Sequence, residues 1–271
     1  MTTRTHSPRS GRPFARRALL RALLAGAALT MSAAPALAAE ARVAVNAGFA
    51  EAAREIGRRF TAQTGHTLAF DVGASGKLYA QIVAGSGADL FLSADVERPV
   101  RADLAGLSAP DTRITYAAGR MVLWSADPDR VDDAGAVLTR PGGLPSLAIS
   151  NPVTSRHGAA AVEVLSSLGV YDDLRPVIVT AADALAVRDM VSDGDVAAGL
   201  LPASMVARRP GDGSRWLVPR ALHAPIRHQA VLMASGARNA AARSFLAFLR
   251  EKPARDIILS FDYETPEPPL R

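Results

Sequence analysis

The stretch Thr67–Ile82 reads TLAFDVGASGKLYAQI and joins a strand pattern to a helix pattern through a junction with two glycines. Thr67–Val72 alternates as a half-buried β-strand does, whereas the apolar residues of Leu78–Ala84 follow the spacing of a helix. A strand that leads directly into a helix is the repeating unit of α/β proteins. The pattern therefore predicts one such unit here, and the flanking sequence repeats it in both directions.

Apolar runs and helical spacing predict the remaining elements in the same way. The other predicted strands are Arg42–Asn46, Asp89–Ser93, one or two within Ile114–Trp124, Ser146–Ser150, Pro176–Thr180, Val196–Leu201 and Gln229–Ala234. The other predicted helices run from Phe49 to Gly65, over Gly158–Leu168, around Val187–Val191 and over Arg238–Arg250. Repeated βα units of this kind predict an α/β fold with mostly parallel sheets flanked by helices.

Charge and composition exclude several classes of protein. Of the 271 residues, 49% are hydrophobic and 21% are charged, which is typical of a globular chain and excludes collagen, coiled coil and wholesale disorder. The net charge is +5, but six of the 31 basic residues lie within residues 1–38, which hold no acidic residue. The remainder has 25 basic and 26 acidic residues, so no nucleic-acid-binding surface is expected.

Residues 1–38 have the three parts of a secretory signal peptide. An arginine-bearing start precedes the apolar stretch Ala22–Met31, and Ala36-Leu37-Ala38 supplies the small-residue cleavage pattern. The apolar stretch is shorter than the roughly 20 residues that span a bilayer, which disfavours a membrane anchor. We expect cleavage after Ala38 or Ala39 and a periplasmic location, with Arg16-Arg17 leaving the general and twin-arginine export routes open. The chain has no cysteine, so no disulfide framework is expected.

Four junctions between a strand and the following helix carry small residues. In α/β folds, ligands bind at the carboxyl ends of strands, where free N–H groups and helix dipoles favour anions. Ordinary capping of each helix by Ser75, Ser155 or Asp183 is the alternative interpretation, and the sequence leaves both open. The junctions are Asn46–Phe49, Gly73–Lys77, Asn151–Gly158 and Thr180–Ala184.

Other catalytic and metal-binding motifs are weak. Gly73–Lys77 lacks the spacing and the following Ser or Thr of a nucleotide P-loop. The histidines after the leader are His66, His157, His223 and His228. None has the spacing of a transition-metal motif, and the sequence contains neither a G-x-S-x-G elbow nor a cysteine nucleophile. Asp89 and Asp95 flank a strand and are interpreted as cap and turn residues rather than as an acid/base pair.

A set of stretches spread over residues 40–266, taken in order, matches a known protein family. They are Ala44–Phe49, Gly73–Ile82 (GASGKLYAQI), Gly87–Asp95 (GADLFLSAD), Asn151–Ala161, His223–Leu232, Ala241–Leu249 and Tyr263. In this order they resemble the periplasmic molybdate-binding proteins that supply ABC transporters. The resemblance implies the two-lobed fold of type II periplasmic binding proteins, with residues 39–116 and 224–271 in lobe one, residues 117–223 in lobe two, and the ligand in the cleft between them.

The resemblance also implies an oxyanion site built mainly from backbone amides. Carried over by position, the ligands are Gly48 and Ser75 from lobe one and the amides of His157 and Ala184 from lobe two. Position 48 is Ser or Asn in other members, and the position of a tyrosine found in some members is Pro202 here. The further candidate ligands are Asn46, Gly76, Lys77, Pro202 and Ser204.

The implied function is transport rather than catalysis. A monomeric exported protein would capture molybdate or tungstate and deliver it to an ABC permease in the inner membrane, without a cofactor, a metal cation or nucleic acid. The same fold could instead bind sulfate, phosphate or an organic anion, since site residues decide function more than the fold does. An enzyme that uses Ser75 or His157 on an anionic substrate is the third hypothesis, which lacks a visible nucleophile–base pair.

Overall fold

The structure is a computed structural model that describes residues 1–6, 38–208 and 211–264. Met1–Leu37 and Ala38–Arg271 form two separate units, and only the second is described below. The predicted signal peptide, with its arginines and apolar stretch, therefore lies almost entirely outside the described residues. Among the described residues, no helix is both long enough and apolar enough to cross a membrane.

The first sheet contains five strands in the order β2-β1-β3-β10-β4. Only β10 runs against the others, because it pairs antiparallel with both of its neighbours. The strands are β1 (Glu40–Asn46), β2 (Thr67–Gly73), β3 (Leu90–Ser93), β4 (Ile114–Gly119) and β10 (Ile226–Leu232). Its helices are α2 (Ala50–Thr64), α3 (Ser75–Val83), α4 (Glu97–Leu104), α8 (Ala240–Phe248) and α9 (Lys252–Ser260).

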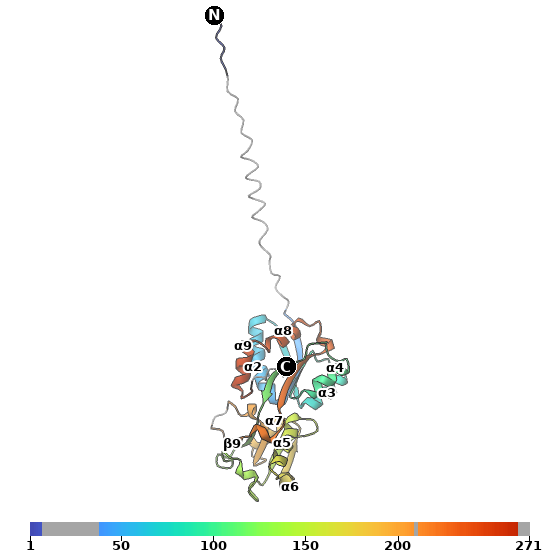
Figure 1. Cartoon of the computed structure of the whole chain (residues 1–271), viewed down its shortest axis with the longest axis vertical. Coiled ribbons are helices and arrows are strands. Elements are labelled where there is room, and N and C mark those ends of the chain that lie inside the picture. Colours follow the sequence, from blue (N-terminus) through green and yellow to red (C-terminus); the bar gives the residue numbers. More distant parts are fainter. Residues whose placement is uncertain (7–37, 209–210, 265–271) are drawn as a thin grey trace. The chain divides into compact units, whose positions relative to one another are not determined.

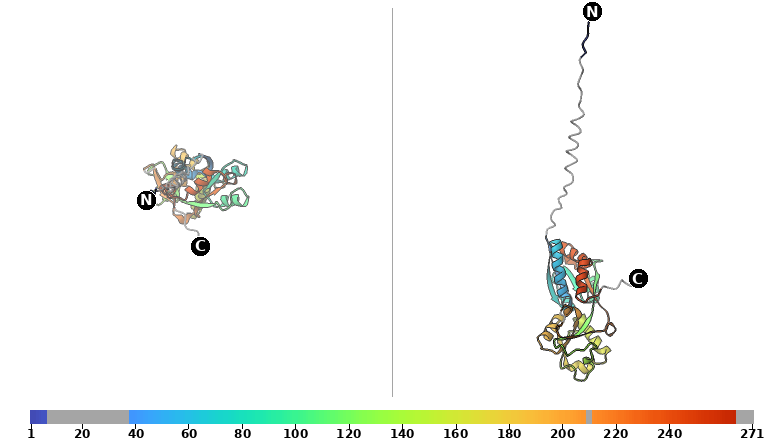
Figure 2. Two further views of the ribbon diagram at one scale, coloured as in Figure 1. Left: turned by 90° about the horizontal axis from the view of Figure 1, so that it is seen from above. Right: turned by 90° about the vertical axis from the view of Figure 1, so that its left-hand side faces the viewer.

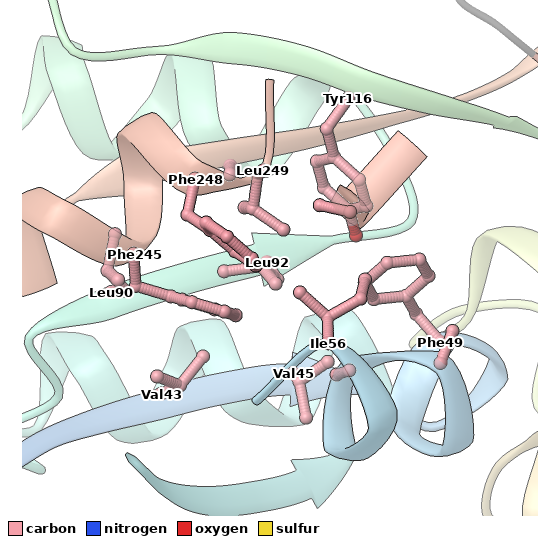
Figure 3. Packing of buried hydrophobic residues seen from close by; sticks show 14 of the residues in the cluster. Val43, Val45, Phe49, Ile56, Leu90, Leu92, Tyr116, Phe245, Phe248 and Leu249 are labelled. Carbon is pink, nitrogen blue, oxygen red and sulfur yellow. The ribbon is translucent and has the colours of Figure 1, made fainter. Parts of the chain in front are cut away.

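The alternation of side chains in β1 divides these helices between the two faces of the sheet. Val43 and Val45 point into the core formed with α2, α8 and α9, whereas Ala44 packs with α3 and α4 on the opposite face. Figure 1 shows the two groups of helices on opposite sides of the sheet, and the right-hand view of Figure 2 shows α2 (blue) beside the red C-terminal helices. In Figure 3, Phe245 and Phe248 reach this core from the C-terminal part of the chain.

The second sheet has the order β7-β6-β8-β5-β9, and only β5 runs against the others. Its strands are β5 (Met121–Ser125), β6 (Leu147–Ser150), β7 (Ile178–Ala181), β8 (Ala198–Pro202) and β9 (Ser214–Leu217). Its helices are α5 (Arg156–Ser167), α6 (Tyr171–Leu174) and α7 (Ala184–Ser192). Helices α5 and α7 contribute to separate buried clusters, so each covers a different face of the sheet.

The α/β prediction with mostly parallel sheets is confirmed, with differences at particular elements. The strand predicted at Pro176–Thr180 begins only at Ile178, because Arg175–Val177 forms a 3-10 turn that contains the proline. Strand β10 begins at Ile226, earlier than the predicted Gln229. Helices α4, α6 and α9 and strand β9 were not predicted. Strand β4 continues in the first sheet to Gly119, so the chain crosses to the second sheet at Arg120, beyond the expected boundary at 117.

Candidate functional site

Junctions from both sheets meet at one small cavity. Its volume is about 10 Å³, close to the roughly 10–15 Å³ that a single water needs. It is lined by Asn46, Ala47, Gly48, Ala74, Ser75, Ala94, Ser155, His157, Asp183 and Ala184. None of these described lining residues is Lys or Arg. All four junctions that the sequence singled out contribute at least one residue, and the residues come from the starts of α3, α5 and α7 and from the 3-10 turn Ala47–Phe49.

Ser75 is the first residue of α3, and its side chain is buried. The residue at the N-cap position is Ala74, and the Ser75 hydroxyl makes no capping hydrogen bond, so the capping interpretation was wrong for this residue. Instead the hydroxyl oxygen accepts a hydrogen bond from the Ala94 backbone N–H at 3.0 Å. The hydroxyl hydrogen takes no part in that bond and donates to none of the described residues, so it remains available as a donor.

Ser155 and Asp183 differ from Ser75 because both are caps. The Ser155 hydroxyl accepts from the Gly158 N–H at 3.4 Å, and one Asp183 carboxylate oxygen accepts from the N–H groups of Leu185 and Ala186. The capping interpretation is therefore confirmed for these two residues. Neither cap uses the N–H of the helical residues His157 and Ala184, which both line the cavity. Asp183 also lines the cavity and is the one acidic residue among its described lining residues.

Gly48 is held by hydrogen bonds to its carbonyl oxygen. The Tyr263 hydroxyl donates to it at 2.7 Å and the Ser204 hydroxyl at 2.8 Å. The Asn46 side chain accepts from the Phe49 N–H and donates to the Leu92 carbonyl, so it caps the same turn. Two donors on one carbonyl fix the plane of the peptide that follows Gly48 and hold the 3-10 turn in place at the edge of the cavity.

His157 is the second residue of α5, and only 2% of its surface is exposed. Burial, followed by the charges of Arg156 and His223, lowers the pKa of its imidazole to about 3, so the ring is neutral at pH 7. Its Nε2 atom is buried and has no hydrogen-bond partner among the described residues. The centroid of the His228 ring lies 5.7 Å from that of His157.

The structure thus brings Asn46, Gly48, Ser75, His157 and Ala184 together around one cavity. The remaining candidate ligands lie outside its lining. Lys77 is exposed on α3, and the N–H of Gly76 donates to the Thr154 carbonyl at 2.8 Å. The Ser204 hydroxyl donates to the Gly48 carbonyl, and the Pro202 ring packs close to Gly48.

Two hydrogen bonds near the cavity join the first-sheet helices α3 and α4 to the loop that follows β6 of the second sheet. Arg98 donates to the Val153 carbonyl at 3.2 Å, next to the bond between Gly76 and Thr154. Asp95 orients Arg98 by accepting from its backbone N–H at 2.8 Å and from its guanidinium at 2.6 Å, which confirms the cap-and-turn interpretation of this carboxylate. Sequence reasoning missed Arg98, because nothing local indicates that its partner lies in another sheet.

The described chain matches a family model described as bacterial extracellular solute-binding protein over residues 41–264. The molybdate-binding protein ModA of Rhodobacter capsulatus is 44% identical over 247 residues, which cover 91% of this chain and 97% of that protein. The ModA protein of Azotobacter vinelandii is 36% identical over 228 residues, which cover 83% of this chain and 90% of that protein. A solved structure of the Azotobacter vinelandii periplasmic molybdate-binding protein has a TM-score of 0.81 at 34% identity and covers 84% of this chain and 100% of its own.

Proposed function

Because this chain belongs to the bacterial extracellular solute-binding proteins and, within them, to the family of molybdate-binding proteins, we propose that it captures molybdate or tungstate in the cavity between its two sheets. Membership of a solute-binding family also agrees with the prediction that the chain is not an enzyme. The observation that carries the choice of an oxyanion is the convergence of three helix N-termini on a cavity whose described lining residues include no Lys or Arg. Helix N-termini favour anions through oriented N–H groups.

Four residues supply the proposed donors. The backbone N–H groups of Gly48, His157 and Ala184 and the hydroxyl of Ser75 belong to the residues that line the cavity. Hydrogen bonds from such dipoles to a charged acceptor are among the stronger ones, so a dianion needs no buried counter-ion here. A fixed set of neutral donors would also suit a tetrahedral oxyanion better than a flexible organic acid.

Binding would require the two lobes to move. A cavity of about 10 Å³ holds little more than one water. A tetrahedral oxyanion would therefore enter when the lobes part and be enclosed when they close, and the bonds from Arg98 and Gly76 to the Val153–Thr154 carbonyls would then favour closure. A ligand that binds the closed form better shifts the population toward it.

The family model describes extracellular proteins, which supports the proposal that residues 1–38 direct export. The closed, loaded protein would then deliver the anion to an ABC permease in the inner membrane. If this is right, the mature protein recovered from the periplasm should begin near Ala39 or Glu40. Recovery of the intact chain, starting at Met1, in a membrane fraction would contradict the leader assignment.

Titration of the mature protein with molybdate, tungstate, sulfate, phosphate and chromate tests the proposal. At about 100 times the dissociation constant, a ligand should stabilise the native state by about 2.7 kcal/mol. For a chain of this size, the melting temperature should rise by roughly 5–10 °C. A shift with sulfate or phosphate alone would favour the alternative ligands, and no shift with any of the five anions would overturn the proposal.

A further inference from the structure

The imidazole of His157 is a polar group without a described partner at the edge of the proposed site. The residue lines the cavity and its Nε2 atom is buried and unpaired. Most buried polar atoms in proteins have a hydrogen-bond partner, and leaving one unpaired is costly. The backbone N–H of this residue already has a place in the proposed site, so the side chain needs a separate explanation.

The position of the ring relates it to Gly48. A Cβ atom added at residue 48 would lie 3.0 Å from the Cε1 atom of His157 and 3.0 Å from the Cγ atom of Pro202. These distances are shorter than ordinary contacts, so the imidazole and the proline ring together occupy the space that a side chain at residue 48 would need. His157 and Gly48 come from different sheets, and the ring therefore reaches across the cleft.

The described groups that act on the ring keep it neutral, and none of them forms an ion pair with it. Facing it are the imidazole of His228 on β10 and the charges of Arg156 and His223, and none of these favours an imidazolium. A neutral imidazole carries one N–H donor. His228 has a buried unpaired Nε2 as well, but it does not line the cavity, and its Nδ1 lies 3.4 Å from both Asn46 Nδ2 and Tyr116 Oη.

We propose, on the basis of the proposed function, that the His157 imidazole is itself a ligand of the oxyanion. Its ring N–H would supply the side-chain hydrogen bond that glycine at position 48 cannot give. The residue would thus contribute two donors, one from the backbone and one from the ring. The alternative is a purely structural ring that pairs with His228 through water.

A matched pair of substitutions separates the two roles. His157→Gln keeps a side-chain N–H donor, whereas His157→Leu fills similar space without one, and both keep the backbone N–H. Molybdate affinity measured by calorimetry should fall about 10- to 150-fold in His157→Leu, which corresponds to the loss of one hydrogen bond to a charged group. His157→Gln should bind at least about tenfold more tightly than His157→Leu. His66→Ala removes another buried imidazole, one that accepts from the Ala39 N–H just before β1, and should leave affinity unchanged.

Substitution of Gly48 gives an independent readout. Gly48→Ser alone should weaken binding, because its side chain meets His157 and Pro202. In the double variant Gly48→Ser, His157→Ala, the ring is gone and the serine hydroxyl can act as the donor, so affinity should exceed that of His157→Ala alone. If the affinity losses of Gly48→Ser and His157→Ala simply add in the double variant, the two side chains do not compete for the same space.

The outcomes distinguish this inference from the proposed function. Equal molybdate affinity in the unsubstituted protein, His157→Gln and His157→Leu would overturn the side-chain role alone, and a lowered melting temperature in His157→Leu would then support the structural pairing with His228. If the unsubstituted protein binds none of the oxyanions, the proposed function fails and the ligand role of His157 fails with it.

Discussion

The two sides of the cavity hold their donors by different means. On the side of the first sheet, the supporting contacts come from distant parts of the chain: Tyr263 bonds to the Gly48 carbonyl, and the Ala94 N–H bonds to Ser75. On the side of the second sheet, Ser155 and Asp183 cap the helices that start at the next residue. Apart from the local Asn46 cap, the first side thus depends on the completed tertiary structure, whereas the other is built within a few residues.

Acidification should produce the largest loss of stability, because it acts on two buried histidines where the two sides meet. The pKa of His157 in the folded chain is about 3, because burial and then the charges of Arg156 and His223 lower it from 6.5. Above pH 6.5 the group is neutral in both states and contributes nothing. As the pH falls below 6.5, only the unfolded chain gains the proton, so the free energy of unfolding should fall by about 2 kcal/mol at pH 5 from this group.

Urea unfolding at pH 7 and pH 5 measures this loss. Burial also keeps the pKa of His228 well below its usual value, so His228 adds a loss in the same direction. His157→Leu should lose less stability than the unsubstituted protein between the two pH values. An identical loss in both would show that the His157 imidazole does not cause it.

Substitution of Ser75 should have the next largest effect and tests the side of the first sheet. Ser75→Ala removes a hydrogen bond to a charged ligand, so molybdate affinity should fall by about 1.5–3 kcal/mol, roughly 10- to 150-fold. It also leaves the buried Ala94 N–H without its partner, so stability should fall as well. The matched control is Ser155→Ala, which should cost about 1 kcal/mol of stability as a lost cap with a smaller change in affinity. Equal affinity losses in the two variants would remove the contrast between the two sides.

Removal of the hydroxyls behind Gly48 should have a smaller effect. Tyr263→Phe deletes one of the two donors to the Gly48 carbonyl and keeps the ring that packs against Phe49. We expect a loss of about 1 kcal/mol in stability, the usual net contribution of one hydrogen bond. Ser204→Ala should behave similarly, and the double variant should lose more than the sum of the two, because the carbonyl then has neither donor. If thermal unfolding shows that the stability losses of the two single variants simply add, the two hydroxyls do not act together on the Gly48 carbonyl.

Lys77→Ala should have the smallest effect. Lys77 is exposed and lies outside the lining of the cavity, although it follows Ser75 by only two residues. Its charge acts through solvent, so affinity should change less than about threefold and the difference should vanish at high salt. A larger loss than that of Ser75→Ala, measured in the same titration, would mean that the site relies on charge rather than on neutral dipoles.

The same contrast explains what could be predicted from the sequence. Local signals were sufficient for the βα units and the four junctions, and they offered Ser155 and Asp183 as caps among two open interpretations, because helix starts depend on neighbouring residues. Ser75 was ambiguous, because its partner Ala94 follows a different strand. Helix α9 was not predicted, although its Ala254 and Ile258 are buried against the core of the first sheet.

Long-range partners could not be predicted from spacing. Nothing near Tyr263 or Ser204 indicates that both hydroxyls bond to the carbonyl of residue 48. The resemblance to a family pointed to Gly48, Ser75, His157 and Ala184 by position, and the structure gathers them at one cavity. The resemblance gave no role to the His157 ring, because the position of the ring depends on which side chains occupy the space near residue 48.

The bond between Gly76 and Thr154 has a consequence for how the protein tolerates change during evolution. Both partners are main-chain groups, so any residue at position 154 still presents the carbonyl oxygen. Position 76 has no such freedom, because an added Cβ would lie 2.8 Å from that oxygen and 3.0 Å from the Cα atom of Thr154. The loop that carries Thr154 can therefore vary in its surface chemistry, while the point where it meets α3 is maintained by a single glycine.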